Sequence, residues 1–362
     1  MVKKKVLHIV EAFGGGVFTV LVDLLNGISN DYDIVVAYSL RPQTPDNFKE
    51  YFNDNIKFIE VKNFARSINL IKDFKAVCEI RKIFKQENPD IVHLHSSKAG
   101  IVGRLAIYNK SVRMLYNPHG FSFLKQDDSR LKRFIYKAIE KGVAIINHKC
   151  TIVGCSNGEY KEAKRLNKNS VCINNGINIE KLKQETNELK EKEIDYDNLK
   201  ICTVGRIGFQ KNPKLFNEIA GLFPNLQFTW IGGGELKNEL TSSNVTVTGW
   251  KDRKMVLEEL NKNDIFLLPS LWEGLPISLL EAMFMKKICI VSDVIGNKDV
   301  IKNEFNGYIC SDVEQYRDCI NKIIKNRNSE NIRNNAREDI FRLYDVNIMI
   351  EEYKRLYLGV EK

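Results

Sequence analysis

Short apolar runs alternate along the chain with longer segments in which apolar residues recur at helical spacing. The run Val6–Val10 opens the first half, and Leu70–Gln86 is one of its amphipathic segments. Because strands and helices that alternate build parallel sheets covered by helices, this pattern predicts an α/β fold. The pattern restarts at Leu199–Val204, after a polar stretch at 180–198 that we interpret as an interdomain linker. The 362 residues are enough for two domains.

Each half has a glycine-rich turn between its first predicted strand and the next helix. Gly15 and Gly16 belong to the first turn, and the turn after Val204 contains Arg206 and Lys211. Free amide groups at a helix start bind anions, and two nearby cations neutralise the bound charge, so the second turn predicts an anion site. The first turn does not have the Gly-x-Gly-x-x-Gly spacing of a dinucleotide-binding fingerprint.

Two carboxylates, Glu273 and Glu281, occur in the apolar stretch Trp272–Met283. Pro276 suits the first turn of a helix, because its missing N–H is not needed there. Burying an acid without a partner is costly, so we expect each acid to face a polar ligand or a counter-charge. On one continuous helix the two acids would lie roughly 12 Å apart. A retaining glycosidase needs about 5–5.5 Å, so this pair does not indicate a hydrolase.

Histidines mark two predicted strand ends in the first half. His93 and His95 share one face of a strand, and His119 ends the next. One interpretation is a metal pair, but no third ligand is evident, so we expect the histidines to line the carboxyl ends of the strands. The sequence also has no Asp-x-Asp at the end of a predicted strand that would carry a divalent metal, and we expect no metal and no cofactor. The eight cysteines include no Cys-x-x-Cys and indicate reduced thiols in a cytoplasmic protein.

Positive charge is concentrated in one segment. Residues 101–180 contain fourteen Lys or Arg against six Asp or Glu, and the whole chain has a net charge of +9. Residues 129–141 have the pattern of a basic amphipathic helix on an anionic membrane. The alternative is a solvated helix that packs its apolar face on its own sheet. No apolar run reaches the length of about 18 residues that spans a membrane, and no nucleic-acid module is present. We expect a peripheral protein at the cytoplasmic face of the membrane, with no nucleic-acid partner.

The stretch from Glu273 to Glu281 resembles the Glu-x7-Glu signature of retaining glycosyltransferases of family 4. Arg206 and Lys211 are similar to that family's Gly-Arg…Lys-Gly loop for the donor diphosphate, although Asn212 replaces the usual glycine. The resemblance implies the GT-B fold, in which two Rossmann-like domains face a cleft. The implied domains are 1–179, on the acceptor side, and 180–344, for the nucleotide sugar, with a C-terminal helix at 345–362 that crosses back to the first.

The resemblance also implies an activity. A hexose or N-acetylhexosamine-type sugar would move, with retention, from a nucleoside-diphosphate sugar, UDP favoured, to a saccharide acceptor. That acceptor would be linked to polyprenyl diphosphate, in surface polysaccharide synthesis. The implied catalytic residues are Glu273, Arg206, Lys211 and His119. The implied donor-binding residues are Gly15, Gly16, Arg206, Lys211, Trp250, Glu273, Gly274, Leu275 and Glu281.

Three other functions use related features. A nucleotide-sugar 2-epimerase would share the architecture and need no acceptor. A nicotinamide-dependent oxidoreductase would need the missing fingerprint. A non-catalytic subunit would bind nucleotide or glycan without turnover, although Glu273, Arg206 and Lys211 argue for catalysis.

Overall fold

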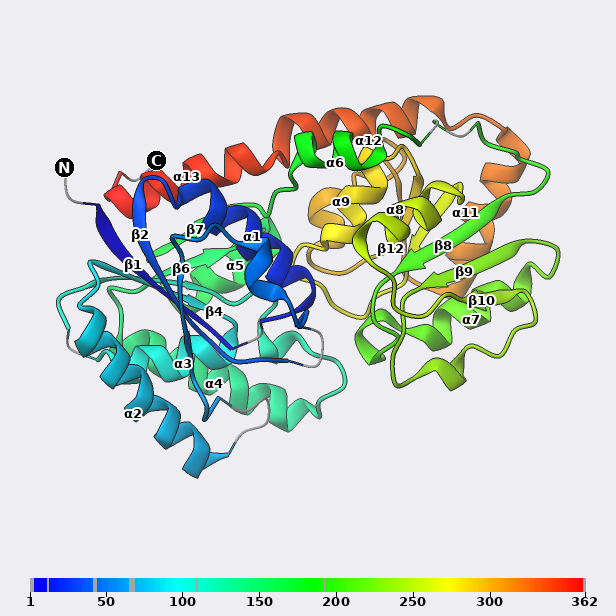
Figure 1. The fold of residues 1–362 in the computed structure, drawn as a ribbon. Helices are drawn as coiled ribbons and strands as arrows, with labels where there is room; N and C mark the ends of the chain where they lie inside the picture. Colours follow the sequence, from blue (N-terminus) through cyan, green and yellow to red (C-terminus); the bar gives the residue numbers. More distant parts are fainter. Residues whose placement is uncertain are drawn as a thin grey trace. The chain divides into compact units, whose positions relative to one another are not determined.

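The computed structural model describes residues 3–11, 13–41, 44–64, 69–108, 110–189, 191 and 193–360. The chain forms two compact units (Figure 1). Unit 1 comprises Met1–Leu124, Asp128–Gly176 and Val346–Lys362, and unit 2 comprises Lys125–Asp127 and Ile177–Asp345. The chain therefore changes unit slightly before the expected boundary at residue 179. The stretch predicted as a linker begins with a helix, α6 (Ile179–Thr186), which packs on α8 (Arg253–Asn261) of unit 2.

Unit 1 is built on a parallel sheet of seven strands in the order β3-β2-β1-β4-β5-β6-β7. The strands are β1 (Lys4–Val10), β2 (Tyr32–Tyr38), β3 (Lys57–Glu60), β4 (Ile91–His95), β5 (Arg113–Asn117), β6 (Thr151–Gly154) and β7 (Ser170–Cys172). The helices are α1 (Gly15–Ile28), α2 (Leu70–Glu87), α3 (Ser97–Ala106), α4 (Arg130–Ile146), α5 (Asn157–Leu166) and α13 (Val346–Leu358).

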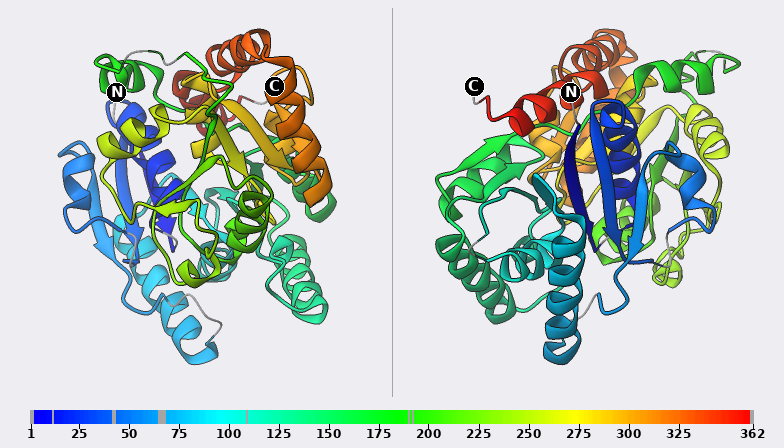
Figure 2. Two further views of the ribbon diagram at one scale, coloured as in Figure 1. Left: turned by 90° about the vertical axis from the view of Figure 1, so that its right-hand side faces the viewer. Right: turned by 60° about the vertical axis from the view of Figure 1, so that its left-hand side comes forward.

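Both faces of this sheet are covered (Figure 2). On one face, Leu7 and Ile9 of β1 belong to a buried cluster with residues of α2 and α3. On the other face, the ring of His8 lies against that of Tyr357 in α13, and α13 packs on α1. Strands covered on both faces have near-continuous apolar sequences, which explains why the run Val6–Val10 lacks polar alternation.

Unit 2 is built on a parallel sheet of six strands in the order β10-β9-β8-β11-β12-β13. The strands are β8 (Lys200–Val204), β9 (Gln227–Ile231), β10 (Val245–Val247), β11 (Ile265–Leu268), β12 (Ile288–Ser292) and β13 (Tyr308–Cys310). Besides α6 and α8, the helices are α7 (Pro213–Leu222), α9 (Ile277–Phe284), α10 (Asn297–Val300), α11 (Val313–Asn326) and α12 (Glu330–Leu343).

In each sheet the strand order reverses beside the first strand of the unit. The reversal lies between β1 and β4 in unit 1, which we call the first switch point, and between β8 and β11 in unit 2, the second switch point. Open α/β sheets bind ligands outside the carboxyl ends of their strands at such reversals. A ligand site is therefore expected in the loops after these four strands.

Helix α4 contains the predicted basic amphipathic segment and turns its apolar stripe outward. Leu131 and Phe134 are 69% and 71% exposed, whereas Glu140 is buried. The Glu140 carboxylate accepts hydrogen bonds from Arg104 Nη2 at 2.6 Å and from the Tyr116 hydroxyl at 2.7 Å. The alternative in which the apolar face of this helix packs on its own sheet is therefore wrong. In the described part of the chain, no helix has the length and apolar character needed to cross a membrane.

Candidate active-site residues

The second switch point brings together the loops after β8 and β11. Lys211 Nζ lies 2.7 Å from Glu273 Oε1. Gln210 Nε2 donates a hydrogen bond to the Trp272 carbonyl oxygen at 2.9 Å and approaches Glu273 Oε2 at 3.3 Å. The carboxylate of Glu273 is buried, and Lys211 supplies the counter-charge that its burial requires. Because an ammonium group has three donors, Lys211 can hold this carboxylate and also face an anionic ligand.

Backbone conformation at Asn212 explains how the lysine is placed. Asn212 has a φ of +55°, in the left-handed region that glycine and asparagine tolerate best. Its side-chain oxygen accepts a hydrogen bond from the Leu215 N–H and so caps α7. Asparagine can therefore occupy the position where the family usually has glycine. The turn is also tight at Gly205, where an added side chain would come within 3.2 Å of Lys211 Cε.

The two acids of the Glu-x7-Glu stretch do not share a helix. Glu273 lies in the loop after β11, and α9 begins only at Ile277, so Glu281 alone is helical. Between the acids, Gly274 is part of the loop and Leu275 is buried. The geometry of one continuous helix therefore does not apply to this pair.

Glu281 has a different cationic partner from Glu273. Its Oε1 forms an ion pair with Arg253 Nη1, and Arg253 Nε lies 3.3 Å from Glu185 Oε2. Burial opposes the charge of Arg253, but the charges and hydrogen bonds of the two acids raise its pKa above the ordinary value. The counter-charge expected for Glu281 is thus present. Arg253 could not be predicted from the sequence, because an arginine at the start of an ordinary polar helix carries no distinguishing signal.

Arg206 lies in the same turn as Lys211 but is bound to another residue. Its Nε and Nη2 donate to the two carboxylate oxygens of Glu235 at 2.9 and 2.6 Å. The side chains of this pair are 34% and 53% exposed, so the pair contributes little to stability and can exchange for a ligand. Trp250 is 63% exposed, and its indole nitrogen lies beside Gly233 in the turn after β9.

At the first switch point, the loop after β1 contains the predicted glycine turn. Gly15 begins α1 with a φ of +56°, and an added side chain there would meet nothing within 4 Å. Gly16 follows it in the first turn of the helix. Glu11, at the end of β1, is ion-paired with Arg41 and accepts a hydrogen bond from Ser96 Oγ at 3.2 Å. The backbone of this turn is therefore open, and its one carboxylate is neutralised.

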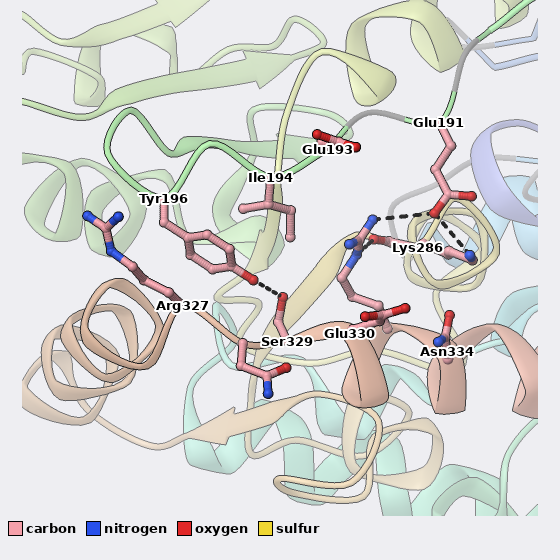
Figure 3. A pocket seen from close by; sticks show the side chains of 11 residues that line it. Glu191, Glu193, Ile194, Tyr196, Lys286, Arg327, Ser329, Glu330 and Asn334 are labelled. Atoms are coloured by element: carbon pink, nitrogen blue, oxygen red, sulfur yellow. Dashed lines mark hydrogen bonds and ion pairs between the residues drawn. The ribbon is translucent and has the colours of Figure 1, made fainter.

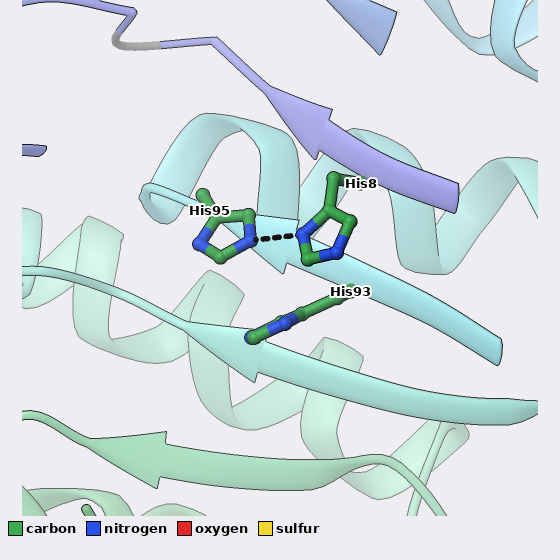
Figure 4. A group of neighbouring side chains, drawn as sticks. All are labelled: His8, His93 and His95. Atoms are coloured by element: carbon green, nitrogen blue, oxygen red, sulfur yellow. Dashed lines mark hydrogen bonds between the residues drawn. The ribbon is translucent and has the colours of Figure 1, made fainter. Parts of the chain in front are cut away.

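Histidines line the same switch point, and the expectation that His93 and His95 lack a third partner is wrong. His8 on β1 brings a third buried imidazole, with one ring nitrogen from each histidine within 4.8 Å of the others (Figure 4). His8 Nδ1 lies 3.0 Å from His95 Nε2. His95 Nδ1 in turn lies 3.1 Å from His119 Nε2.

Hydrogen bonds already occupy both ring nitrogens of His95 and of His93. His93 Nδ1 contacts the Tyr357 hydroxyl at 2.7 Å, and His93 Nε2 contacts Asn117 Oδ1 at 2.6 Å. A metal ion at this cluster would have to replace several of these bonds. Burial lowers the pKa of His93 to about 3 and that of His119 to about 4. Burial also holds the pKa values of His8 and His95 well below the usual 6.5, so the cluster is uncharged at neutral pH.

His119 is held in a strained turn. Its φ is +51°, and Gly120 follows with a φ of +94°. The Gly120 N–H donates to Glu159 Oε1 at 2.6 Å, and the Cys155 N–H donates to the other oxygen of this buried carboxylate at 2.8 Å. A non-glycine residue in the left-handed region costs on the order of 1 kcal/mol, so the surrounding bonds fix where the imidazole points.

Two family descriptions match the chain. They are Glycosyltransferase Family 4, over residues 14–181, and Glycosyl transferases group 1, over residues 183–339. The UDP-Gal:alpha-D-GlcNAc-diphosphoundecaprenol alpha-1,3-galactosyltransferase of Escherichia coli is 33% identical over 337 residues, which cover 86% of each chain. The chain belongs to glycosyltransferase family 4.

Two further likenesses extend this assignment. This glycosyltransferase is 27% identical over 339 residues to the N,N'-diacetylbacillosaminyl-diphospho-undecaprenol alpha-1,3-N-acetylgalactosaminyltransferase of Campylobacter jejuni, covering 88% of this chain and 90% of the relative. Sucrose-phosphate synthase from Thermosynechococcus elongatus superposes with a TM-score of 0.81 at 17% identity, over 99% of both chains. At that identity the structural likeness concerns the fold alone, and it agrees with two Rossmann-like units of the GT-B type.

Unit 2 of this glycosyltransferase also contains a cavity of about 520 Å³ (Figure 3). Its lining includes Lys286, Arg333 and Glu191, and the predicted site residues lie outside it. Glu191 Oε1 lies 2.9 Å from Lys286 Nζ and 3.7 Å from Arg333 Nη2. The two cations share one carboxylate as partner, so the cavity gives no reason to place the donor diphosphate there.

Proposed function

We propose that this glycosyltransferase moves a hexose or N-acetylhexosamine-type sugar, with retention of configuration, from a UDP-sugar to a saccharide linked to polyprenyl diphosphate. The step would belong to the synthesis of a capsule, an exopolysaccharide or an O-antigen. The relatives from Escherichia coli and Campylobacter jejuni, whose names both include a diphospho-undecaprenol acceptor, support this substrate class. The observation that carries the proposal is the Lys211–Glu273 ion pair at the second switch point.

In this proposal the charged groups of unit 2 hold the donor. Lys211 and Arg206 neutralise the diphosphate, for which Arg206 leaves its exposed partner Glu235. Glu273 accepts hydrogen bonds from sugar hydroxyls, next to the amides of Gly274. Lysine and arginine differ here, because the lysine is a compact charge and the arginine can bind two phosphate oxygens at once.

The remaining site residues orient the ends of the donor. Glu281 binds the ribose hydroxyls. Its Oε1 pairs with Arg253, and its other carboxylate oxygen is the acceptor for these hydroxyls. The backbone near Trp250 meets the base. In unit 1, His119 donates a hydrogen bond to the sugar, and the open backbone at Gly15 approaches the diphosphate or the acceptor, as does Gly16.

Bond cleavage in this scheme gives an oxocarbenium-like sugar and a nucleoside diphosphate. The acceptor hydroxyl attacks from the face of departure, and an oxygen of the donor phosphate takes its proton, so configuration is retained without a protein nucleophile. The cations aimed at the leaving group replace a divalent metal. Removing one such preorganised group typically costs about 10²–10³ in rate.

A binding panel followed by an acceptor assay tests the proposal. UDP, GDP and their glucose, galactose and N-acetylhexosamine derivatives are compared by thermal shift, where a ligand at 100 times its Kd stabilises by about 2.7 kcal/mol. The stabilising sugar is then incubated with and without an undecaprenyl-diphosphate-linked saccharide. Release of UDP that depends on the acceptor supports transfer. Conversion of the nucleotide sugar without acceptor would indicate an epimerase, and binding without turnover would indicate a silent subunit; either result overturns the proposal.

The outward stripe of α4 supports a second part of the proposal, which is that this helix rests on an anionic membrane surface. Leu131 and Phe134 are largely exposed, and Ile135 beside them is 45% exposed. Arg130 and Lys141 are exposed cations of the same helix. Apolar side chains that enter the headgroup region between cations are the usual basis of interfacial binding, and a lipid-linked acceptor is presented at that surface.

Vesicle sedimentation tests this surface. We expect the protein to sediment with vesicles that contain phosphatidylglycerol and much less with vesicles of phosphatidylcholine alone. The double variant Leu131→Ser/Phe134→Ser should lose this binding while UDP-sugar binding is kept. The matched control is Phe305→Ser/Phe341→Ser, which changes two exposed aromatic residues of unit 2. Equal sedimentation of both variants would contradict the assignment of α4.

A further inference from the structure

We propose that His8, His95 and His119 form a directed chain of neutral imidazoles, in which every ring carries its proton on Nδ1 and His119 presents an N–H at Nδ1 to its ligand. His8 and His95 act through His119 and are therefore positioning residues. The direction of the chain follows from unit 1 alone. Only the nature of the ligand, an oxygen of the nucleotide sugar, rests on the proposed function.

Counting protons leaves two arrangements. A neutral imidazole has one donor nitrogen and one acceptor nitrogen. The two contacts, His8 Nδ1 with His95 Nε2 at 3.0 Å and His95 Nδ1 with His119 Nε2 at 3.1 Å, each need one hydrogen. The single proton of His95 serves one contact, and its position then fixes the protons of both neighbours. Either all three rings are protonated at Nε2 or all three are protonated at Nδ1.

The buried end of the chain distinguishes these arrangements. His8 Nε2 is buried and has no hydrogen-bond partner among the residues that the structure describes. Protonation at Nε2 throughout would leave an N–H there without an acceptor. Buried N–H groups without acceptors are rare in native proteins, whereas buried acceptors that are under-used are less so. The unpartnered nitrogen of His8 is therefore the unprotonated one, and the protons lie on Nδ1 along the whole chain.

Packing holds the three rings in this order. The ring planes of His8 and His95 differ by 14°, with centroids 5.3 Å apart, and those of His95 and His119 differ by 18°, with centroids 5.4 Å apart. His8 and His95 are almost inaccessible to solvent, at 0% and 1% exposure. They come from the neighbouring strands β1 and β4, whose register fixes their separation. The left-handed turn at His119 then sets the direction of the last ring.

His93 is excluded from the chain by its own bonds. Asn117 Nδ2 donates to the Tyr353 hydroxyl at 2.8 Å, so Asn117 Oδ1 is the acceptor for the N–H at His93 Nε2. His93 Nδ1 then accepts the hydrogen of the Tyr357 hydroxyl. The cluster thus contains four neutral rings of two kinds, three protonated at Nδ1 and one at Nε2.

The tautomers can be read directly from the full-length protein. Long-range proton–nitrogen correlation spectra of a histidine-labelled sample distinguish Nδ1–H from Nε2–H rings, and the chain has five histidines in all. Single substitutions assign the signals, with exposed His148 as the control. We expect His8, His95 and His119 to be protonated at Nδ1 and His93 at Nε2. A His119 signal protonated at Nε2 would overturn the proposal, whatever the enzymatic activity.

Two variants of His95 test the functional consequence. Asparagine places its amide nitrogen near the Nδ1 position, so His95→Asn keeps a donor for His119 Nε2. His95→Gln places its amide nearer to the Nε2 position and loses that donor. We expect His119 to stay an Nδ1–H tautomer in His95→Asn and to become mixed in His95→Gln. The kcat of His95→Gln should fall about tenfold with KM little changed, the value of one hydrogen bond, and His95→Asn should recover most of that loss.

The possible outcomes distinguish a failure of the imidazole chain from a failure of the proposed glycosyltransferase function. If the tautomers are as expected and no nucleotide sugar is turned over, the proposed function fails and the imidazole chain stands. If sugar transfer occurs and both variants lose activity equally with an unchanged His119 tautomer, the positioning role fails. Stoichiometric zinc in the purified protein, with the ring-nitrogen signals of His8 and His95 shifted until a chelator is added, would replace the chain by a metal site.

Discussion

The two switch points have the same strand topology and opposite electrostatic character. At the first, the strand ends carry imidazoles whose pKa values burial lowers, and Glu11 is balanced by Arg41. At the second, Lys211 and Arg253 face the buried carboxylates of Glu273 and Glu281. Both switch points are built from parallel strands in the same order. The residues of the loops and strand ends, and not the sheet, therefore determine whether a switch point is charged or neutral.

The largest effect on turnover should come from the second switch point. Glu273→Ala removes the proposed sugar contact and also frees Lys211, so turnover should fall by at least about 10²–10³ while the fold is kept. The measurement is acceptor-dependent release of UDP, with circular dichroism to check folding. Asp293→Ala is the control, because that acid is exposed and paired with exposed Lys298. Near-normal turnover of Glu273→Ala would mean that the second switch point is not the site of transfer.

At the first switch point, we instead expect the free energy of unfolding to depend on pH. All five histidines lie in unit 1, and His8, His93 and His95 are buried with lowered pKa values. A lowered folded-state pKa means that the unfolded chain binds more protons below pH 6.5, so stability is full above 6.5 and is lost as the pH falls toward 3. Each buried histidine should cost up to about 1.4 kcal/mol per pH unit in that window.

Denaturant unfolding at pH 7 and pH 5.5 measures this loss of unfolding free energy. Amide hydrogen exchange at the same two pH values shows which unit loses it. Amides of unit 1 should lose protection on acidification more than amides of unit 2, which has no histidine. Equal losses in the two units would show that the histidine cluster is not the titrating element.

A smaller effect on turnover is expected at Arg206, the partly exposed cation of the second switch point. Arg206→Ala breaks only a surface pair with Glu235, so unfolding free energy should change by less than about 1 kcal/mol. If Arg206 binds the diphosphate, kcat should still fall by about 10², the lower end of the range for a preorganised group, because this side chain is partly exposed. Glu235→Ala, which frees the arginine, is the matched comparison and should keep its activity. Parallel losses in the two variants would indicate that the ion pair, and not the free arginine, is what matters.

The smallest effect should be at Trp250. Its side chain is 63% exposed, so Trp250→Ala should leave stability unchanged. If the ring also stacks on the base, the Kd for UDP should rise by about fivefold or more, since stacking of a base on an aromatic side chain contributes about 1–3 kcal/mol. Calorimetry with UDP and with GDP measures this, and an unchanged Kd would limit the contribution at this position to the backbone.

Much of this architecture could be predicted, because its signals are local. Alternating apolar runs predicted parallel α/β layers, and the glycine turn with Arg206 and Lys211 predicted where cations gather. The comparisons confirm the GT-B family and the glycosyltransferase activity. The roles of individual residues toward the donor remain predictions.

What the sequence could not reveal depends on contacts between distant segments. His8 and His95 are 87 positions apart, and only the pairing of β1 with β4 brings them together. Arg253 and Glu281 lie on separate helices, so their ion pair is set by packing. The direction of the α4 stripe was ambiguous for a similar reason, because periodicity gives an apolar face without saying which way it turns.

That direction has a cause in the interior. Glu140 and Arg104 are paired at 1% and 0% side-chain exposure, and turning the apolar stripe of α4 inward would carry Glu140 outward and leave Arg104 buried without its partner. Separating such a pair costs about 3–5 kcal/mol, roughly a third of the stability of many domains. The buried Arg104–Glu140 ion pair therefore keeps Leu131 and Phe134 on the exposed face of α4. Replacing both residues with leucine would remove this restraint, and the helix could then turn its exposed apolar side chains toward the core.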